Sequence, residues 1–188
     1  TWGLLAPIFV GSALFFTALM WGLWHYMKSG RGFSREISSE LGRAIRNQEF
    51  VIHYLPTMDN QSGLCIGAEA LIRWNHPRQG LVMPDIFIPI AERTGMIVPM
   101  TQWLIEQLSI EMGEWLKANP TCYLSINISA SHFESPFFLK RAYQTLHRHG
   151  IHPSQLTLEI TERELIDNSC STTRKVLQLA NQYGFKLA

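Results

Sequence analysis

Hydrophobic and polar residues change their spacing several times along the chain, and each change predicts an element. Residues 50–59 (FVIHYLPTMD) and 64–74 (LCIGAEALIRW) are expected to be strands, and the turn-rich NQSG between them suits a hairpin. A helix should begin near Pro84, because proline fits the first turn, and should end near Gly95. A shorter helix is expected over residues 37–47.

The clearest helical periodicity lies between residues 99 and 118. Its large hydrophobic residues recur at steps of three and four and form one core-facing stripe: Trp103, Leu104, Leu108, Met112, Trp115 and Leu116. Beyond this helix, the pattern predicts strands over 122–128, 156–160 and 185–188, separated by helices over 137–149 and 171–183. Strands that alternate with helices predict a parallel sheet and an α/β fold.

The first part of the chain has a different composition. No Asp, Glu, Lys or Arg occurs from Thr1 to Met27, and a helix needs about 20 apolar residues to span a bilayer. Aromatic residues near both ends of this run, and basic residues from Lys28 onward, predict a transmembrane helix followed by a cytoplasmic segment. A signal peptide or a buried helix is the alternative, but the run is too long for either. The expected division is a transmembrane helix over 1–27, a linker over 28–39 and one globular domain over 40–188.

Charge and cysteine content exclude several classes of protein. The chain has 16 basic and 15 acidic residues, so no overall field indicates a nucleic-acid partner. Cys65, Cys122 and Cys170 are far apart and form no C-x-x-C motif, which favours reduced thiols. The sequence contains no nucleophile elbow, P-loop or dinucleotide fingerprint. The histidines lack a regular ligand spacing, and we assign them no metal role.

Polar residues interrupt one face of two predicted strands. In TCYLSINIS, Leu124, Ile126 and Ile128 share one side of the pleat, so Asn127 points to the other side. In QLTLEIT the same alternation places Glu159 opposite the leucines. Each of these strands thus carries an oxygen donor near its carboxyl end, which is where α/β sheets assemble their sites.

A third strand adds an acid and a base on one face. Glu69 and Arg73 are an even number of residues apart and share a side of the pleat. Glu69, Asn127 and Glu159 offer only oxygen donors, which suits Mg²⁺ or Mn²⁺, and an arginine nearby suits a phosphate. The combination indicates metal-assisted phosphoester hydrolysis, whereas a structural Glu69–Arg73 ion pair is the alternative.

Three ordered segments resemble the EAL family of phosphodiesterases. They are EALIRWNHPRQGLVMPDIFIPIAERTG (69–95), LSINISASHF (124–133) and LTLEITERELI (156–166). The resemblance covers roughly residues 40–188. It implies a TIM-like (β/α)₈ barrel with an antiparallel first strand, of which this chain contains the first part, and the Mg²⁺- or Mn²⁺-dependent hydrolysis of cyclic di-GMP to linear pGpG.

The resemblance also assigns roles to individual residues. Glu69, Asn127 and Glu159 match family metal ligands, Glu69 being counted as catalytic as well, and Arg73 matches the residue that holds a substrate phosphate. Glu162 matches a catalytic position that braces the substrate and the metal loop. The alternative is that Glu162 is a surface acid at the start of a helix. Leu55 occupies the substrate-binding position that is usually glutamine in a Y-Q-P motif, so a polar contact is expected to be lost.

Both ends of the sequence look truncated. The chain begins at Thr1 and stops at GFKLA, before the D-D-F-G segment that supplies further metal ligands in this family. We therefore expect a phosphodiesterase of the bacterial inner membrane, with its EAL part in the cytoplasm and a homodimer when complete, that is inactive as this fragment. A non-catalytic EAL-like module that binds cyclic di-GMP or a protein is the second hypothesis, and a remnant without function is the third.

Overall fold

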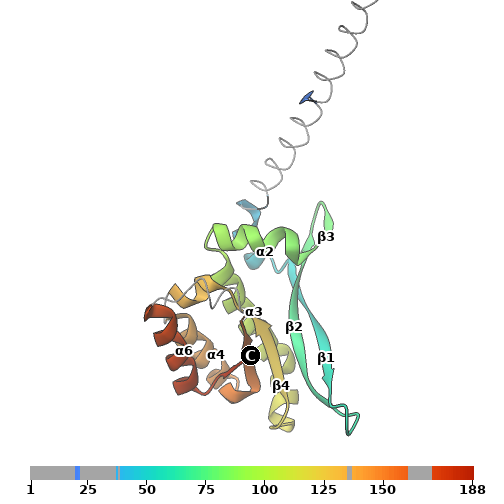
Figure 1. Ribbon diagram of the computed structural model, residues 1–188. Helices are drawn as coiled ribbons and strands as arrows, with labels where there is room; N and C mark the ends of the chain where they lie inside the picture. Colours follow the sequence, from blue (N-terminus) through green and yellow to red (C-terminus); the bar gives the residue numbers. More distant parts are fainter. Residues whose placement is uncertain (1–19, 22–36, 38, 135–136, 161–170) are drawn as a thin grey trace, which may run out of the picture. The chain divides into compact units, whose positions relative to one another are not determined.

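The computed structural model describes residues 20–21, 37, 39–134, 137–160 and 171–188. The chain divides into two compact units, Thr1–Glu40 and Leu41–Ala188. Nearly all of the expected transmembrane helix and linker lies outside the described residues. Among the residues that are described, no helix has the length and apolar character needed to cross a membrane. The fold described below is that of the second unit (Figure 1).

A mixed sheet of six strands forms the centre of this unit, in the order β1-β2-β4-β5-β6, with β3 paired to β2. The strands are β1 (Phe50–Met58), β2 (Cys65–His76), β3 (Gly80–Val82), β4 (Tyr123–Asn127), β5 (Leu156–Glu159) and β6 (Lys186–Leu187). β1 and β2 form the expected antiparallel hairpin, and β2, β4, β5 and β6 run parallel to one another. The predicted α/β fold and the antiparallel first strand are both confirmed.

The helices agree with the sequence pattern to within about two residues. They are a helix over 39–46, α2 (Pro84–Arg93), α3 (Ile97–Ala118), α4 (Phe137–Arg148), α6 (Ser171–Tyr183) and the 3₁₀ turns η1 (Ala130–Glu134) and η2 (Pro153–Gln155). Pro84 occupies the first turn of α2, as expected. The short strand β3 was not predicted, because three residues after a polar turn are too few to show an alternation.

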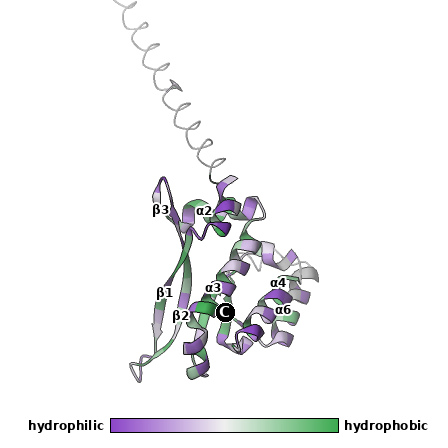
Figure 2. Cartoon of the chain, turned by 180° about the vertical axis from the view of Figure 1, so that it is seen from behind, coloured by the Kyte–Doolittle hydropathy of each residue, from purple (hydrophilic) through white to green (hydrophobic). Residues whose placement is uncertain are grey.

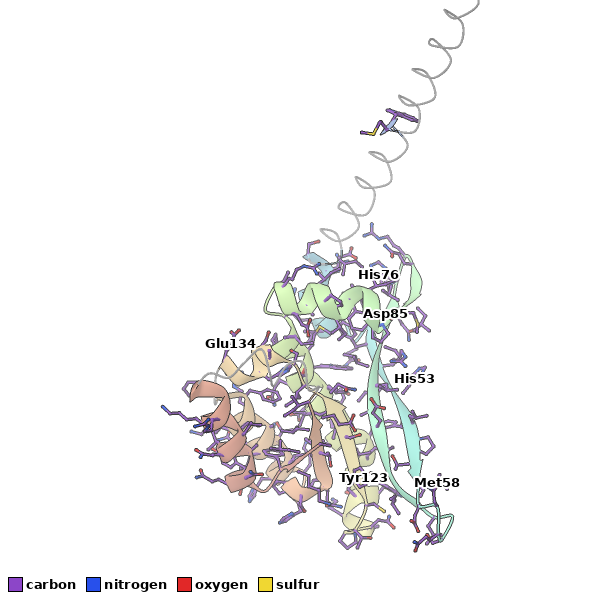
Figure 3. The ribbon with its side chains drawn as sticks, in the orientation of Figure 1. His53, Met58, His76, Asp85, Tyr123 and Glu134 are labelled. Atoms are coloured by element: carbon purple, nitrogen blue, oxygen red, sulfur yellow. The ribbon has the colours of Figure 1, made fainter. Side chains whose placement is uncertain are left out.

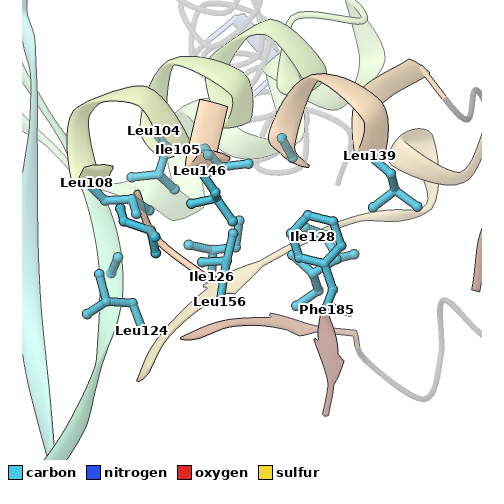
Figure 4. Packing of buried hydrophobic residues seen from close by; sticks show 14 of the residues in the cluster. Leu104, Ile105, Leu108, Leu124, Ile126, Ile128, Leu139, Leu146, Leu156 and Phe185 are labelled. Carbon is cyan, nitrogen blue, oxygen red and sulfur yellow. The ribbon is translucent and has the colours of Figure 1, made fainter. Parts of the chain in front are cut away.

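The core lies between the sheet and the helices α3, α4 and α6, which cover the same face (Figure 1). Leu124, Ile126, Leu156 and Leu158 from the strands are at most 1% exposed. They pack against leucines and isoleucines of α3 and α4 (Figure 4). Each covering helix contains both hydrophobic and hydrophilic residues (Figure 2), as is typical of a helix with one face against a sheet. This packing confirms the faces predicted for the strands.

The close approach of β2 to β4 requires a glycine. A Cβ atom built at Gly67 would lie 2.6 Å from the carbonyl oxygen of Tyr123, with which Gly67 is in register. No other residue type fits at this distance without separating the strands. Gly67 therefore sets the spacing of the two strands that carry Glu69 and Asn127.

Candidate active site

Three neighbouring parallel strands bring the predicted oxygen donors together. Glu69 on β2 is in register with Ser125 on β4, and Asn127 on β4 is in register with Glu159 on β5. Residues in register across a ladder, and residues two apart on one strand, share a face. Glu69, Asn127 and Glu159 therefore project from the face opposite the helices. Unlike the other two, Glu69 lies in the middle of its strand, because β2 continues to His76 through pairing with β1 and β3.

Two of the three donors are in direct contact. The amide nitrogen Nδ2 of Asn127 donates a hydrogen bond of 2.7 Å to Oε1 of Glu69. This bond uses the amide nitrogen and leaves the amide oxygen of Asn127 as the atom that can bind a cation. The main chain reinforces the arrangement, since the N–H of Ile128 donates to the carbonyl oxygen of Glu159 at 3.0 Å.

Arg73 belongs to the same region. It lies on β2 on the same face as Glu69, and its Nη1 donates to the carbonyl oxygen of Ile72 at 2.9 Å. Arg73 and Asn127 both line a cavity of about 360 Å³. The other residues that line it come from β2, the segment after β4, and the helices α2 and α3: Ala70, Leu71, Ile72, Pro84, Asp85, Ile88, Pro89, Glu92, Ile97, Met100, Thr101, Leu104, Ile128 and Ser129.

The cavity is a wedge between two diverging strands. The pairing of β2 with β4 ends at Glu69, so residues 70–73 separate from the segment that follows Asn127. Helices α2 and α3 supply the rest of the wall, which is mainly hydrophobic. Asp85, Glu92 and Thr101 are the polar exceptions that the sequence did not single out. The position of Asp85 in the first turn of a helix was the available signal.

The structure disfavours the alternative of a Glu69–Arg73 ion pair. Among the described residues, ion pairs join Glu114 to Lys117 and Glu106 to Arg148 and His149, but none joins Glu69 to Arg73. The Glu69 carboxylate instead accepts from Asn127, so it is not explained as half of a structural ion pair.

The donor set fits a hard divalent cation. Carboxylate and amide oxygens suit Mg²⁺ or Mn²⁺, and the hydrogen bond from Asn127 to Glu69 places these two side chains next to each other. Among the described residues, no three His, Cys, Asp or Glu side chains form a metal-binding group. Glu162, the third acid that the sequence predicted here, lies outside the described residues.

Leu55, His76 and two of the cysteines also lie in the described part of the structure. Leu55 is 57% exposed and lies directly opposite Glu69 in the β1–β2 ladder. His76 is buried, its ring is tilted by 54° from that of Trp74, and its Nδ1 accepts from the N–H of Arg78 in the turn after β2. Cys65 and Cys122 are free thiols, as expected, and Cys170 lies outside the described residues.

Figure 3 shows the two ends of the sheet. His53 and Asp85 are labelled toward the end where the carboxyl termini of the parallel strands meet, and Met58 and Tyr123 toward the opposite end. Because β1 is antiparallel to β2, Val51 near its start is in register with Arg73, and Leu55 further along is in register with Glu69. The site is thus at the carboxyl end of the parallel strands.

Comparison with known proteins decides the family. The EAL domain profile matches residues 38–188, which is most of the chain. The chain belongs to the EAL family. It is 36% identical over 151 residues to the Pseudomonas aeruginosa protein named Cyclic di-GMP phosphodiesterase PA2567, a match that covers 80% of this chain and 26% of that protein. It is also 35% identical over 161 residues to the Escherichia coli protein named Probable cyclic di-GMP phosphodiesterase PdeG, covering 84% of this chain and 32% of that protein.

Solved EAL structures share the fold. The structure titled PaMucR Phosphodiesterase, c-di-GMP complex, superimposes with a TM-score of 0.73 and 31% identity, covering 81% of this chain and 62% of that one. The cAMP- and cyclic-di-GMP-bound form of EAL Enzyme Bd1971 gives a TM-score of 0.72 and 28% identity, covering 82% of this chain and 43% of that one. The chain therefore has the TIM-like EAL fold but spans less than two thirds of the proteins it matches.

Proposed function

We propose that this EAL chain is part of a divalent-metal-dependent phosphodiesterase that hydrolyses cyclic di-GMP to linear pGpG. The observation that carries the proposal is the contact between Asn127 and Glu69, with Glu159 in register beside Asn127. The names of the relatives support the substrate, because two of them are named cyclic di-GMP phosphodiesterase, one as probable, and both solved relatives have cyclic di-GMP bound by title.

Each residue of the site has a definite task in this proposal. Glu69, Asn127 and Glu159 would hold Mg²⁺ or Mn²⁺, and the bound metal would supply Lewis-acid activation of water and stabilise charge on the phosphate. The guanidinium of Arg73 binds a non-bridging phosphate oxygen, and Glu162 braces the substrate. The hydrophobic wall of the wedge-shaped cavity excludes water from the part of the nucleotide that enters it.

We further propose that catalysis needs more chain than these 188 residues. The matched part of the PaMucR phosphodiesterase structure is 62% of that chain, so that relative contains residues without a counterpart here. In the described part of this chain, β1 pairs only with β2 and β6 only with β5, which leaves two sheet edges for further strands. The isolated chain should therefore be inactive.

The proposed location is the bacterial inner membrane, with the EAL part in the cytoplasm. The support is the sequence alone: residues 1–27 contain no charged side chain, and basic residues follow directly. A homodimer of the complete protein is proposed on family resemblance. Membrane anchoring is tested by alkaline carbonate extraction: an anchored protein stays in the pellet, whereas a peripheral one is released.

The activity is tested on the longer protein that contains this chain. Purified protein is incubated with cyclic di-GMP and Mg²⁺ or Mn²⁺, and linear pGpG is quantified by chromatography. Glu69→Gln should lower the rate by about 100-fold or more, because a neutral amide cannot replace a charged ligand. Glu106→Gln, which changes an equivalent side chain on the outer wall between α3 and α4, is the matched control and should hydrolyse at the wild-type rate. Absence of metal-dependent hydrolysis in the wild type refutes the proposal.

The second candidate is a non-catalytic module that binds the nucleotide, and Leu55 favours it. A hydrophobic side chain stands where the family usually has a polar one, directly opposite the proposed metal ligand Glu69. Equilibrium binding of cyclic di-GMP without turnover, unaffected by removal of divalent metal with EDTA, would identify this module. Turnover that EDTA abolishes would identify the enzyme.

A further inference from the structure

His132 is a buried polar residue that the proposed chemistry does not use. It lies in the 3₁₀ turn η1, which begins three residues after Asn127, and it is 1% exposed. Its ring packs edge-on against Phe138 at 4.7 Å between centroids. Burying an imidazole in such a place is costly unless its nitrogens are hydrogen-bonded, so its partners indicate its role.

The two ring nitrogens join separate parts of the chain. The backbone N–H of Ser129 donates to Nδ1 at 3.0 Å, and Nε2 lies 2.9 Å from Oγ1 of Thr101 on α3. The Thr101 hydroxyl donates to the carbonyl oxygen of Ile97 at 3.0 Å, so its oxygen accepts from Nε2. A backbone N–H can only donate, which assigns Nδ1 as an acceptor although the Ser129 carbonyl is also near. These contacts are satisfied by a ring that accepts at Nδ1 and donates from Nε2.

This ring connects the loop after Asn127 to the first turns of α3. Ser129 is two residues from Asn127, and Thr101 and Ser129 both line the wedge-shaped cavity. On the other side, the N–H of Ile128 is bonded to Glu159. Asn127 itself is exposed, so its position depends on the backbone on which it stands and on its contact with Glu69.

We propose that His132 is a positioning residue of the metal site. It fixes residues 127–129 against α3, so that the amide oxygen of Asn127 points to the cation that Glu69 and Glu159 also bind. The inference rests on the proposed function for the identity of the site. It concerns metal affinity in the first place, and turnover only as a consequence.

The test compares two substitutions in the longer protein, with Mn²⁺ binding followed by electron paramagnetic resonance. His132→Gln keeps an acceptor for Ser129 and a donor for Thr101, and should retain Mn²⁺ affinity to within about threefold. His132→Leu removes both bonds and should weaken Mn²⁺ binding by about 10- to 100-fold, the range found when the outer support of a metal ligand is lost.

Gln155 offers a matched control at the opposite end of the same strands. It is 5% exposed, and its Nε2 donates to the carbonyl oxygens of Leu116, Asn119 and Cys122, so it anchors the loop that enters β4. Gln155→Leu removes a comparable buried anchor far from Asn127. It should lower the melting temperature as His132→Leu does, but leave Mn²⁺ affinity unchanged.

The outcomes separate the two proposals. Loss of Mn²⁺ affinity in His132→Leu alone supports the positioning role. Equal loss in His132→Leu and Gln155→Leu, or no loss in either, overturns it, because the effect would then follow general stability. A wild type that binds Mn²⁺ without hydrolysing cyclic di-GMP overturns the proposed function only, and a wild type that binds no Mn²⁺ overturns both.

Discussion

Leu55 on β1 and Glu69 on β2 lie directly opposite each other in the antiparallel ladder. Their side chains share the face that carries Asn127 and Glu159, so the proposed metal ligand has a hydrophobic neighbour. Leu55 is 57% exposed, which means that the described fold does not use it for packing. Because Leu55 is neither buried nor polar, its substitution should change the binding of the ligand and not the stability of the fold.

Leu55→Gln should strengthen nucleotide binding. A glutamine here can hydrogen-bond to cyclic di-GMP, and one added hydrogen bond contributes about 0.5–1.5 kcal/mol, or about a two- to tenfold lower KM. Steady-state kinetics of the longer protein measure KM and kcat separately. Leu64→Gln changes a leucine that is 67% exposed in the hairpin turn and should leave both constants unchanged. A KM that is equal in Leu55→Gln and wild type would remove Leu55 from the binding site.

Gly67→Ala should separate β2 from β4. The added methyl group would lie 2.6 Å from the Tyr123 carbonyl oxygen, and backbone atoms on both sides cannot move without breaking the ladder. Overpacking of this kind costs about 1–3 kcal/mol in the free energy of unfolding, and Mn²⁺ affinity should fall with it because Glu69 moves away from Asn127. Chemical denaturation and Mn²⁺ titration provide the two measurements.

Gly42→Ala is the appropriate control for this substitution. Gly42 lies in the helix over 39–46, and a Cβ there would make only ordinary contacts, the nearest at 3.6 Å from Met96. Alanine in a helix is favoured over glycine by about 0.5–1 kcal/mol, so this variant should be slightly more stable than wild type. Equal destabilisation by both substitutions would mean that the spacing between β2 and β4 is not critical.

Glu106 should make the stability of the α3–α4 contact depend on pH. Burial acts to raise the pKa of Glu106, but a hydrogen bond from His149 and the charge of Arg148, at 3.1 and 2.7 Å, lower it below its ordinary value of 4.5. A lowered carboxyl pKa stabilises the folded state above the ordinary value, and the stabilisation is lost as the pH falls through the folded-state pKa.

The comparison of wild type with Glu106→Gln tests this dependence. The variant should melt at a lower temperature than wild type at pH 7, and the difference should vanish as the pH is lowered well below 4.5, where the carboxyl group is neutral in both states. Thermal melts of both proteins across this range are the measurement. A difference that persists in acid would assign the effect to packing and not to charge.

The sequence predicted most of the fold because its strands alternate strictly and its helices have strong stripes. Leu124, Ile126, Leu156 and Leu158 are all in the core, as their spacing required. The same alternation placed Asn127 and Glu159 on the opposite face, and the ladder between β4 and β5 then set them in register. The hydrophobic periodicity predicts the face on which each residue lies, because this face depends only on the residue's position within its own strand.

The remaining features depend on contacts between distant segments. Ile105 is 0% exposed although it falls beside the predicted stripe of α3, because a helix covered on several sides buries more than one stripe. The connection from Ser129 through His132 to Thr101 crosses 31 residues and leaves no local pattern. The contact between Asn127 and Glu69 spans 58 residues, so periodicity gave its face and only the structure gave its distance.

Residues 38–188, expressed alone, should aggregate or be degraded. Within the described part, the sheet ends at β1 and β6, and each edge presents unpaired backbone groups that can pair with another chain. Exposed hydrophobic residues at the β1 edge, such as Leu55 at 57% and Met58 at 51%, add to this tendency. Size-exclusion chromatography and a thermal melt of the isolated residues 38–188 test the prediction. A single monomeric peak with one cooperative transition would contradict it and would show that this part of the EAL fold is stable without further strands.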